Sequence, residues 1–394
     1  MASVGSAAII IAPRPAIALM SSARRIRVAY CLDSFDTGGT ELNAVRTIEQ
    51  IDRQRYDVSF ICLSNRGALA ERVRAAGVPI HEFPIRGLVS LSTMRTGLRL
   101  ARFLRAQRID VLHAHDIYSN IFAVPWARVA GVPLVIASRR WWYAVNRPVH
   151  LQMNRLTYRM AHRVLANSES VGRLVESEGV PHARVVVVPN FVEEYAFDPT
   201  SPQQLSEWRR EFGLSTGDEV VGIIANLHRV KDHASLLDAV ALLAPKRPLL
   251  RLVVVGDGSE RAALEARAAA LGIRDRVVFA GRRPQRPTLH GLFDVSVLCS
   301  LGEGFPNSIV EAMAAGKPMV ATAVGGVVDV VVDAVTGYLV PPASPSALAE
   351  GIERLLADPT RALAMGACGA ARARELYYAS NVISRLESIY DGVL

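Results

Sequence analysis

A repeated alternation of strand and helix patterns constrains the fold of this chain most. Short apolar runs rich in β-branched residues are each followed by a glycine-containing turn and a stretch of helical period. This order is typical of βαβ units, in which helices connect parallel strands. We expect strands at 27–31, 57–63, 111–114, 134–137, 163–166 and 185–188, and a second set at 220–225, 250–255, 277–280, 295–299, 319–321 and 338–340.

The two sets of strands indicate two α/β domains. A length of 394 residues favours the same division, because one core seldom serves more than about 250 to 300 residues. We expect an N-terminal domain at 23–192, a proline-containing linker at 193–217, and a C-terminal domain at 218–370. The last segment, 371–394, is expected to form a helix that packs back toward the N-terminal domain. Residues 1–22 are interpreted as a flexible leader.

The four cysteines, Cys31, Cys62, Cys299 and Cys368, show no paired spacing. Cys31, Cys62 and Cys299 lie in apolar, strand-like runs that predict buried thiols, and the four together predict a reducing compartment with neither a disulfide nor a cysteine-bound metal. The apolar stretches are interrupted by charges, glycine or proline, so we expect no membrane-spanning helix. The expected location is cytoplasmic.

Positive charge is concentrated in the first half of the chain. Of the net charge of +8, residues 1–200 carry +9 and residues 201–394 carry −1. A basic half suits an anionic surface such as phospholipid or polyphosphate. Residues 139–163 combine six arginines with Trp141, Trp142 and Tyr158, a mixture that predicts peripheral contact with an anionic membrane, at the inner face of the plasma membrane.

A second basic helix is expected around Arg95, Arg99 and Arg102, and an ordinary solvated helix is the alternative reading for both basic segments. Nucleic acid is not an expected partner, because no recognised nucleic-acid-binding motif accompanies the charge.

The segment 300–322, SLGEGFPNSIVEAMAAGKPMVAT, holds the most specific motif. It begins where a predicted strand ends, and open α/β sheets bind ligands at that edge. Pro306, Asn307 and Ser308 favour the start of a helix, predicted at 306–315, whose free N–H groups and positive dipole end suit a diphosphate. Glu303 and Glu311 flank this helix start, and their carboxylates can accept hydrogen bonds from the vicinal hydroxyls of a sugar and a ribose.

This motif resembles the signature of the family 4 retaining glycosyltransferases, which have the GT-B fold of two Rossmann-like, doubly wound parallel-sheet domains facing a cleft. The resemblance implies that Glu303 contacts donor-sugar hydroxyls and Glu311 the ribose diol. It also implies that the backbone around Phe305, Pro306, Asn307 and Ser308 holds the phosphates, and that no cofactor besides the sugar nucleotide is needed.

Further segments extend the resemblance through the second half. Residues 222–233 resemble the family loop whose arginine and lysine neutralise the leaving diphosphate. Lys231 falls on the lysine, Asn226 falls where arginine is usual, and Arg229 is inferred to supply the second cation. Gly256 lies in a G-x-G turn and Arg282 in a loop where relatives bind the base, although purely structural turn glycines are an alternative reading. Asp329 stands where the family has a longer acid.

The first half carries the expected acceptor side. Gly38 and Gly39 match the family's N-terminal glycine loop, with Gly38 expected on the acceptor side and Gly39 expected to approach the donor phosphate across the cleft. His115 belongs to an H-x-H-D stretch that is expected to line the cleft. The spacing of His113 and His115 would also suit a metal, but no third ligand is evident and none is expected. Arg139 stands where many relatives carry a histidine. Because arginine cannot act as a base, we expect this position to bind an anionic acceptor or the donor phosphate.

Together these features predict a retaining glycosyltransferase of hexosyltransferase type. It would move a sugar from a nucleoside diphosphate sugar, of UDP or GDP type, to a hydroxyl of a glycan or lipid-linked acceptor, as in surface polysaccharide synthesis. Two alternatives stay open. A GT-B nucleotide-sugar epimerase would form product without an acceptor, and a catalytically silent glycan- or lipid-binding module would not turn over a donor.

Overall fold

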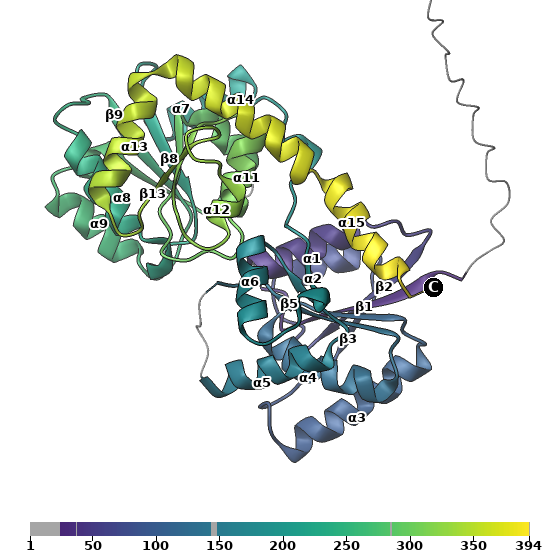
Figure 1. The fold of residues 1–394 in the computed structure, drawn as a ribbon. Coiled ribbons are helices and arrows are strands. Elements are labelled where there is room, and N and C mark those ends of the chain that lie inside the picture. The colour runs from purple at the N-terminus through teal and green to yellow at the C-terminus, as the bar shows by residue number, and fades with distance from the viewer. Residues whose placement is uncertain (1–23, 37, 143–147, 284–285, 394) are drawn as a thin grey trace, which may run out of the picture.

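The computed structural model describes residues 24–36, 38–142, 148–283 and 286–393, so the expected leader at 1–22 and Tyr143 lie outside the described residues. Two parallel sheets form the centres of two Rossmann-like domains (Figure 1). The first sheet has seven strands in the order β3-β2-β1-β4-β5-β6-β7, and the second has six in the order β10-β9-β8-β11-β12-β13. In both sheets the strand order reverses beside the first strand, which is where such folds bind ligands at the carboxyl edge.

The N-terminal domain alternates strands and helices along the chain. Its strands are β1 (Ile26–Leu32), β2 (Tyr56–Cys62), β3 (Ile80–Glu82), β4 (Val111–Ala114), β5 (Leu134–Arg139), β6 (Arg163–Ala166) and β7 (Val185–Val187). Its helices are α1 (Gly39–Gln50), α2 (Leu69–Ala75), α3 (Leu91–Ala106), α4 (Ile117–Ala130), α5 (Pro148–Met160) and α6 (Glu169–Ser177), with a short 3-10 turn, η1 (His182–Arg184).

The connecting segment holds η2 (Glu194–Ala196) and α7 (Pro202–Glu211). The second sheet then contains β8 (Glu219–Ile224), β9 (Leu250–Val255), β10 (Val277–Gly281), β11 (Val295–Leu298), β12 (Met319–Thr322) and β13 (Tyr338–Val340). The helical elements around it are η3 (Arg229–Lys231), α8 (His233–Leu243), α9 (Arg261–Ala270), η4 (Arg274–Arg276), α10 (Arg286–Leu289), η5 (His290–Leu292), α11 (Asn307–Ala314), α12 (Val327–Val330), α13 (Pro345–Ala357) and α14 (Pro359–Leu376), and α15 (Ala379–Asp391) ends the chain.

Strand β3 was not predicted from the sequence, and the end of the C-terminal domain differs from the expected boundary. β3 has only three residues, none of them buried, so it lacks the apolar run that marks the other strands. The domain boundary expected at residue 370 falls inside α14, which continues to Leu376. The helix break follows at Tyr377 and Tyr378, just before α15 begins.

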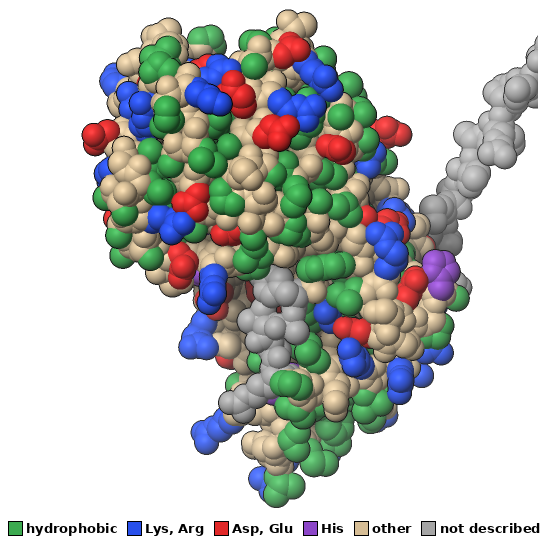
Figure 2. All heavy atoms as spheres, turned by 60° about the vertical axis from the view of Figure 1, so that its left-hand side comes forward, with side chains coloured by type: hydrophobic (Ala, Val, Ile, Leu, Met, Phe, Trp, Pro, Cys, Tyr) green, Lys and Arg blue, Asp and Glu red, His purple; other side chains and the backbone are tan. Residues whose placement is uncertain are grey.

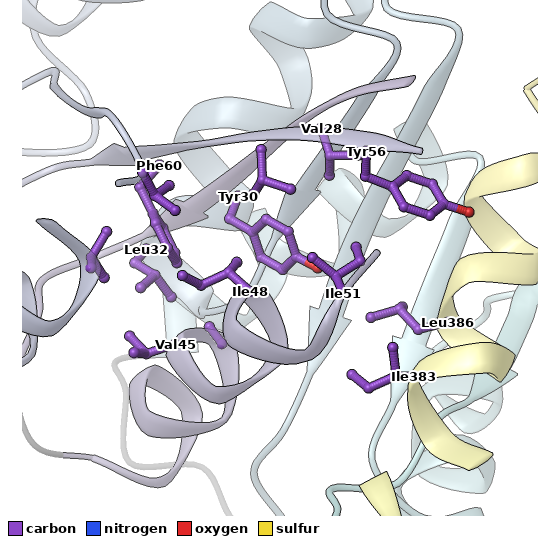
Figure 3. Packing of buried hydrophobic residues seen from close by; sticks show 14 of the residues in the cluster. Val28, Tyr30, Leu32, Val45, Ile48, Ile51, Tyr56, Phe60, Ile383 and Leu386 are labelled. Carbon is purple, nitrogen blue, oxygen red and sulfur yellow. The ribbon is translucent and has the colours of Figure 1, made fainter. Parts of the chain in front are cut away.

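The last helix packs on the N-terminal domain. Ile383 and Leu386 of α15 join the apolar cluster formed by α1, β1 and β2 (Figure 3). Tyr390 is fully buried, and its hydroxyl donates a 2.8 Å hydrogen bond to the hydroxyl of Tyr30 in β1. The chain crosses between the domains near Val192 and again near Tyr378, and these two residues form an isolated parallel bridge.

Within the described residues, none of the helices combines the length and apolar character needed to cross a bilayer.

Candidate active site

The helix of the most specific motif lies at the carboxyl edge of the second sheet. α11 spans Asn307–Ala314, within one residue of the predicted helix at each end. Pro306 is its N-cap residue. Phe305 is buried and packs edge-on against Tyr377, with 5.6 Å between the ring centres. This packing supports the turn before α11, in which the Asn307 N–H donates to the carbonyl oxygen of Phe305 at 3.1 Å. The Ser308 N–H, in the first turn of the helix, is left without an intrahelical partner.

A second helix from the other domain begins at the same place. Gly39 is the first residue of α1, after the N-cap Gly38. A Cβ atom at Gly39 would lie 3.4 Å from Nδ2 of Asn307. The N-terminal ends of α1 and α11 therefore meet across the domain boundary, and each end carries positive dipole potential and free N–H groups. An anion placed here would be attracted by both domains.

Asn190, in the segment that leaves the first sheet, connects the two domains at this point. Its Oδ1 accepts a 2.9 Å hydrogen bond from Arg140, and its Nδ2 donates one of 2.9 Å to Oδ1 of Asn307. The sequence analysis did not single out Asn190. The available signal was a polar residue directly after a strand at the domain boundary, where the carboxyl edge of the sheet faces its partner.

Glu303 and Lys231 form an ion pair beside α11. Nζ of Lys231 lies 2.5 Å from Oε2 of Glu303, and the Ser300 hydroxyl donates to the same oxygen at 3.2 Å. Both charged side chains retain some exposure, 23% for Lys231 and 13% for Glu303. Arg229 begins the short turn η3 and is exposed, and its side chain forms no hydrogen bond or ion pair with a described residue. The structure thus pairs Lys231 with Glu303, while the Arg229 side chain is held by no partner among the described residues.

Asp232, directly after Lys231, adopts a left-handed backbone with φ of 48°. Aspartate tolerates this conformation better than most residues. Its side chain accepts hydrogen bonds from the backbone N–H and the hydroxyl of Ser235, and it thereby caps the start of α8. The cap fixes the end of the turn that carries Lys231.

Glu311 lies deeper than Glu303. Its side chain is 6% exposed, and its Oε1 lies 3.9 Å from Nη1 of Arg46 in α1. Arg46 also pairs with Glu193 at 3.4 Å. A guanidinium group from the N-terminal domain thus reaches the second motif glutamate, a neighbour that the sequence analysis did not anticipate because the contact crosses the domain boundary.

Gly256 and Gly258 are required by close packing of two loops. A Cβ at Gly256 would overlap the carbonyl oxygen of Ala225, and one at Gly258 would overlap that of Leu227. Gly256 also has a positive φ of 145°. These loops follow β9 and β8 at the carboxyl edge. Arg282, directly after β10, is exposed at the same edge.

His115 does not line an open cleft. It is 1% exposed, and its ring stacks on those of His113 and Tyr30, with ring centres 4.0 and 5.0 Å away. Burial lowers the pKa of both histidines well below the usual value. His113 bonds to Tyr390 at 2.7 Å and to Ser138 at 2.9 Å. The expectation that His115 lines the cleft is therefore wrong; it is a neutral core residue behind the site.

Arg139 is also not available as predicted. It is 3% exposed, its Nη1 lies 3.3 Å from Oε1 of Glu178, and its guanidinium stacks on Trp141. These partners occupy it within the N-terminal domain. The neighbouring Arg140 instead reaches Asn190, and its Nε is buried without a partner among the described residues. Arg139 is thus held by Glu178 and Trp141, whereas Arg140 contacts the segment that joins the domains.

The basic and aromatic stretch is partly buried. Besides Arg139, Tyr158 is fully buried. Trp142 is half-buried, and its ring lies against Gly325 of the C-terminal domain. Among the described residues of the stretch, Arg155, Arg159 and Arg163 are exposed. The predicted membrane contact through 139–163 is therefore wrong for Arg139 and Tyr158, and it stays a prediction for the exposed arginines.

Three carboxylates gather at the carboxyl edge of the first sheet, namely Asp33, Glu41 and Asp116. Burial raises the pKa of each, that of Asp33 to about 7, and repulsion from neighbouring carboxylates adds to the rise. Oδ1 of Asp33 accepts a 2.6 Å hydrogen bond from the Ser119 N–H. The glycine loop closes over this group, because a Cβ at Gly38 would overlap the carboxylate of Glu41. Asp33 was missed in the sequence, although it directly follows an apolar strand.

Asp329 has a role in joining the domains. Its carboxylate accepts hydrogen bonds from the backbone N–H of Ser170 at 2.7 Å and from the Ser170 hydroxyl at 3.0 Å. Ser170 lies in the first turn of α6, so Asp329 of one domain caps a helix of the other.

Two family models match successive parts of the chain. Residues 38–190 match a glycosyl transferase 4-like domain, and residues 204–372 match glycosyl transferases group 1. The 2-deoxystreptamine glucosyltransferase of Streptomyces kanamyceticus is 29% identical over 75% of this chain and 81% of its own length. A D-inositol 3-phosphate glycosyltransferase of Corynebacterium aurimucosum is 26% identical over 91% of each chain.

Solved structures share the architecture along nearly the whole chain. HepE of Anabaena in complex with UDP superposes with a TM-score of 0.84 at 22% identity, over 93% of this chain and all of that one. WaaG, a glycosyltransferase involved in lipopolysaccharide biosynthesis, gives a TM-score of 0.71 at 17% identity, over 93% of this chain and all of that one. These likenesses show the GT-B fold. With both domain models matched in order, the chain belongs to the family 4 glycosyltransferases.

Proposed function

We propose that this glycosyltransferase moves a sugar from a nucleoside diphosphate sugar to an acceptor hydroxyl with retention at the anomeric carbon. One observation carries the proposal: the N-terminal ends of α1 and α11 converge from opposite domains beside the Lys231–Glu303 pair. Such a place suits a diphosphate, with a sugar on the side of Glu303 and a ribose on the side of Glu311. Retention rests on the resemblance of the Glu303–Glu311 motif to the retaining family.

The donor would lie along the carboxyl edge of the second sheet. The backbone at Phe305–Ser308 would hold the phosphates, and Gly256 and Arg282 would lie toward the base. Uridine diphosphate sugars are the first candidates, because structures of HepE contain UDP and UDP-glucose. Guanosine diphosphate sugars are the alternative. No further cofactor or metal is part of the proposal.

The main task of the site is to stabilise the negative charge that develops on the leaving diphosphate. When the bond from the anomeric carbon to the phosphate oxygen breaks, its electron pair stays on that oxygen. Lys231, with Arg229 and the two helix ends, would stabilise the negative charge. The acceptor oxygen bonds to the carbon on the same face, and its proton passes to the leaving phosphate oxygen. This route needs no base from the enzyme, which suits a site where His115 is buried and neutral and Arg139 is tied to Glu178.

The acceptor would approach from the N-terminal domain, past Gly38 and the carboxylates below it. We propose a glycan or a lipid-linked glycan in surface polysaccharide synthesis. The lipid-linked form is supported by the basic first half of the chain. Turnover of soluble oligosaccharide acceptors but not of their lipid-linked forms would refute the lipid-linked part alone.

The donor site can be tested by thermal stabilisation of the purified protein with UDP, GDP and their sugars. A ligand that binds only the native state stabilises it by about 2.7 kcal/mol at one hundred times its Kd. We expect one nucleotide to raise Tm, and Glu311→Ala to abolish the shift while the exposed Glu350→Ala keeps it. No shift with any nucleotide would favour a silent binding module.

Turnover separates the remaining alternatives. We expect release of nucleoside diphosphate to depend on an added acceptor and the product to keep the anomeric configuration of the donor, as NMR of the product would show. Isomerised sugar formed without an acceptor would instead indicate an epimerase.

A further inference from the structure

Helix α3 presents an apolar stripe that nothing in the described structure covers. Leu91, Met94 and Leu98 are 76%, 57% and 46% exposed, and Val89, just before the helix, is 84% exposed. The spacing of three and four residues places the three helical side chains on one face. The opposite face is buried, with Leu100 fully enclosed. In its first two turns, α3 therefore has apolar side chains on its exposed face as well as on its buried face.

Positive charge surrounds this stripe. Residues 83–109 contain six arginines and neither aspartate nor glutamate. Arg95, Arg99 and Arg102 are exposed on the outer side of α3, and none forms an ion pair with a described residue. We call Val89, Leu91, Met94 and Leu98 together with these three arginines the α3 surface.

The α3 surface lies at a distinct end of the molecule. Figure 2 shows hydrophobic side chains gathered at the lower end of the N-terminal domain, where α3 lies in Figure 1, with basic side chains at the margin. α3 follows β3, and helices of a parallel sheet begin at the carboxyl edge of the strands. The apolar first turns of α3 are thus at the same edge of the domain as the Gly38 loop, on the acceptor side.

Helix α5 has exposed residues of the same two kinds. α3 and α5 both pack against α4. On α5, Val149 and Leu156 are 55% and 59% exposed, and Arg155 and Arg159 are exposed beside them. α5 therefore carries exposed apolar side chains among arginines, as α3 does.

We propose that the α3 surface docks on an anionic phospholipid bilayer. Apolar side chains on an amphipathic helix enter the boundary between headgroups and acyl chains, and arginines beside them meet lipid phosphates. A nucleic acid would use the arginines but leave the four apolar side chains in water. The benefit of docking rests on the proposed function, because a bilayer at the α3 surface would bring lipid-linked acceptors close to the acceptor side of the site. The docking itself does not depend on catalysis.

Vesicle binding tests the surface directly. The full chain is sedimented with vesicles of phosphatidylcholine, with and without phosphatidylglycerol, over a range of salt. We expect binding only to the anionic vesicles, weakening as salt rises. Arg95→Gln/Arg99→Gln/Arg102→Gln should lower the partition constant about a hundredfold, since each arginine near the surface contributes about a factor of five. Leu91→Ser/Met94→Ser/Leu98→Ser should lower it about tenfold or more.

Matched controls lie on the other domain and on α15. Leu242→Ser/Leu363→Ser removes exposed leucines from the C-terminal domain, and Arg385→Gln removes an exposed arginine from α15; both should bind as the wild type does. All variants change exposed side chains, and the nucleotide-induced Tm shift reports that the donor site is intact. Equal loss in the control variants, or no binding of the wild type to anionic vesicles, would overturn the proposal. A change of oligomeric state in the leucine and methionine variant, without loss of vesicle binding, would assign the stripe to a second copy instead.

The two proposals fail separately. If vesicle binding is lost in the α3 variants but turnover of a soluble acceptor is kept, docking stands. If the wild type binds vesicles but shows no donor turnover, the proposed transfer reaction is wrong and the lipid-docking surface still stands.

Discussion

The side-chain amide of Asn190 donates a 2.9 Å hydrogen bond to the amide oxygen of Asn307, the first residue of α11. Asn190 in turn accepts from Arg140 at 2.9 Å. The chain of three polar side chains runs from the N-terminal domain to the helix end that is proposed to hold phosphate. The relative position of the two domains is therefore linked to the orientation of the residue nearest the proposed diphosphate.

Asn190→Ala is expected to weaken donor binding without removing any group that touches the donor. It deletes a hydrogen bond with a net value of about 1 kcal/mol, so the donor Kd should rise about fivefold. Asn307→Ala should have a similar or larger effect. Isothermal titration with the nucleotide, in a double-mutant cycle, should show the two changes to be less than additive. Full additivity would mean that the bond does not contribute to binding.

Lys231→Ala is expected to lower kcat by about 100- to 1000-fold, because it removes a cation from the charge that develops on the leaving diphosphate. The exposed Lys246→Ala is a matched control and should leave kcat unchanged. Since Lys231 and Glu303 lie 2.5 Å apart, Glu303→Gln should leave the lysine without its partner, and the double variant should be far from additive. Steady-state kinetics with a fixed acceptor measures this. A normal kcat in Lys231→Ala would refute the proposed role.

Gly304→Ala should separate the domains locally. A Cβ at Gly304 would overlap the carbonyl oxygen of Arg140 in the N-terminal domain, and backbone cannot yield as a flexible side chain does. We expect the donor Kd to rise about tenfold, which corresponds to about 1.4 kcal/mol of binding free energy. The Tm of each domain should change little. Gly87→Ala, where nothing lies within 4 Å of the added carbon, is the control. Unchanged affinity in Gly304→Ala would show that this contact is not part of the donor-binding state.

Periodicity predicted the parts of the fold that are made within one segment. The strands of both sheets, except β3, and the helix at 306–315 follow from local patterns of apolar, glycine and proline residues, because those patterns report burial and chain direction. The short β3, with no buried residue, carries no such pattern. The end of the C-terminal domain could not be placed from the sequence, because the helical period of α14 continues without a break past residue 370 to Leu376.

Contacts across the domain boundary could not be read from the sequence. Asn190, Arg46 and the Ser170–Asp329 cap meet partners more than 100 residues away, and spacing along the chain says nothing about such pairs. The same limit explains the choice of Arg139. Two consecutive arginines leave a strand in opposite directions, and only the folded structure shows that Arg139 turns to Glu178 while Arg140 turns to Asn190.

Asp33 is expected to make the stability of the N-terminal domain depend on pH. Burial raises its pKa to about 7 from an ordinary value of 3.8, with Glu41 adding repulsion. Between these two values the folded carboxyl keeps its proton while the unfolded one is ionised, so the free energy of unfolding falls as pH rises from about 4 to about 7.

Asp33→Asn keeps an acceptor for the Ser119 N–H but does not titrate. It should raise the free energy of unfolding at pH 8 by about 4 kcal/mol at most, and should flatten the pH dependence. Urea unfolding across this range measures the effect, with the exposed Asp198→Asn, outside this group of carboxylates, as control. If the slope of Asp33→Asn matches the wild type, Asp33 is not the group that titrates, and the pH dependence must come from Asp116 or Glu41, whose pKa values burial also raises.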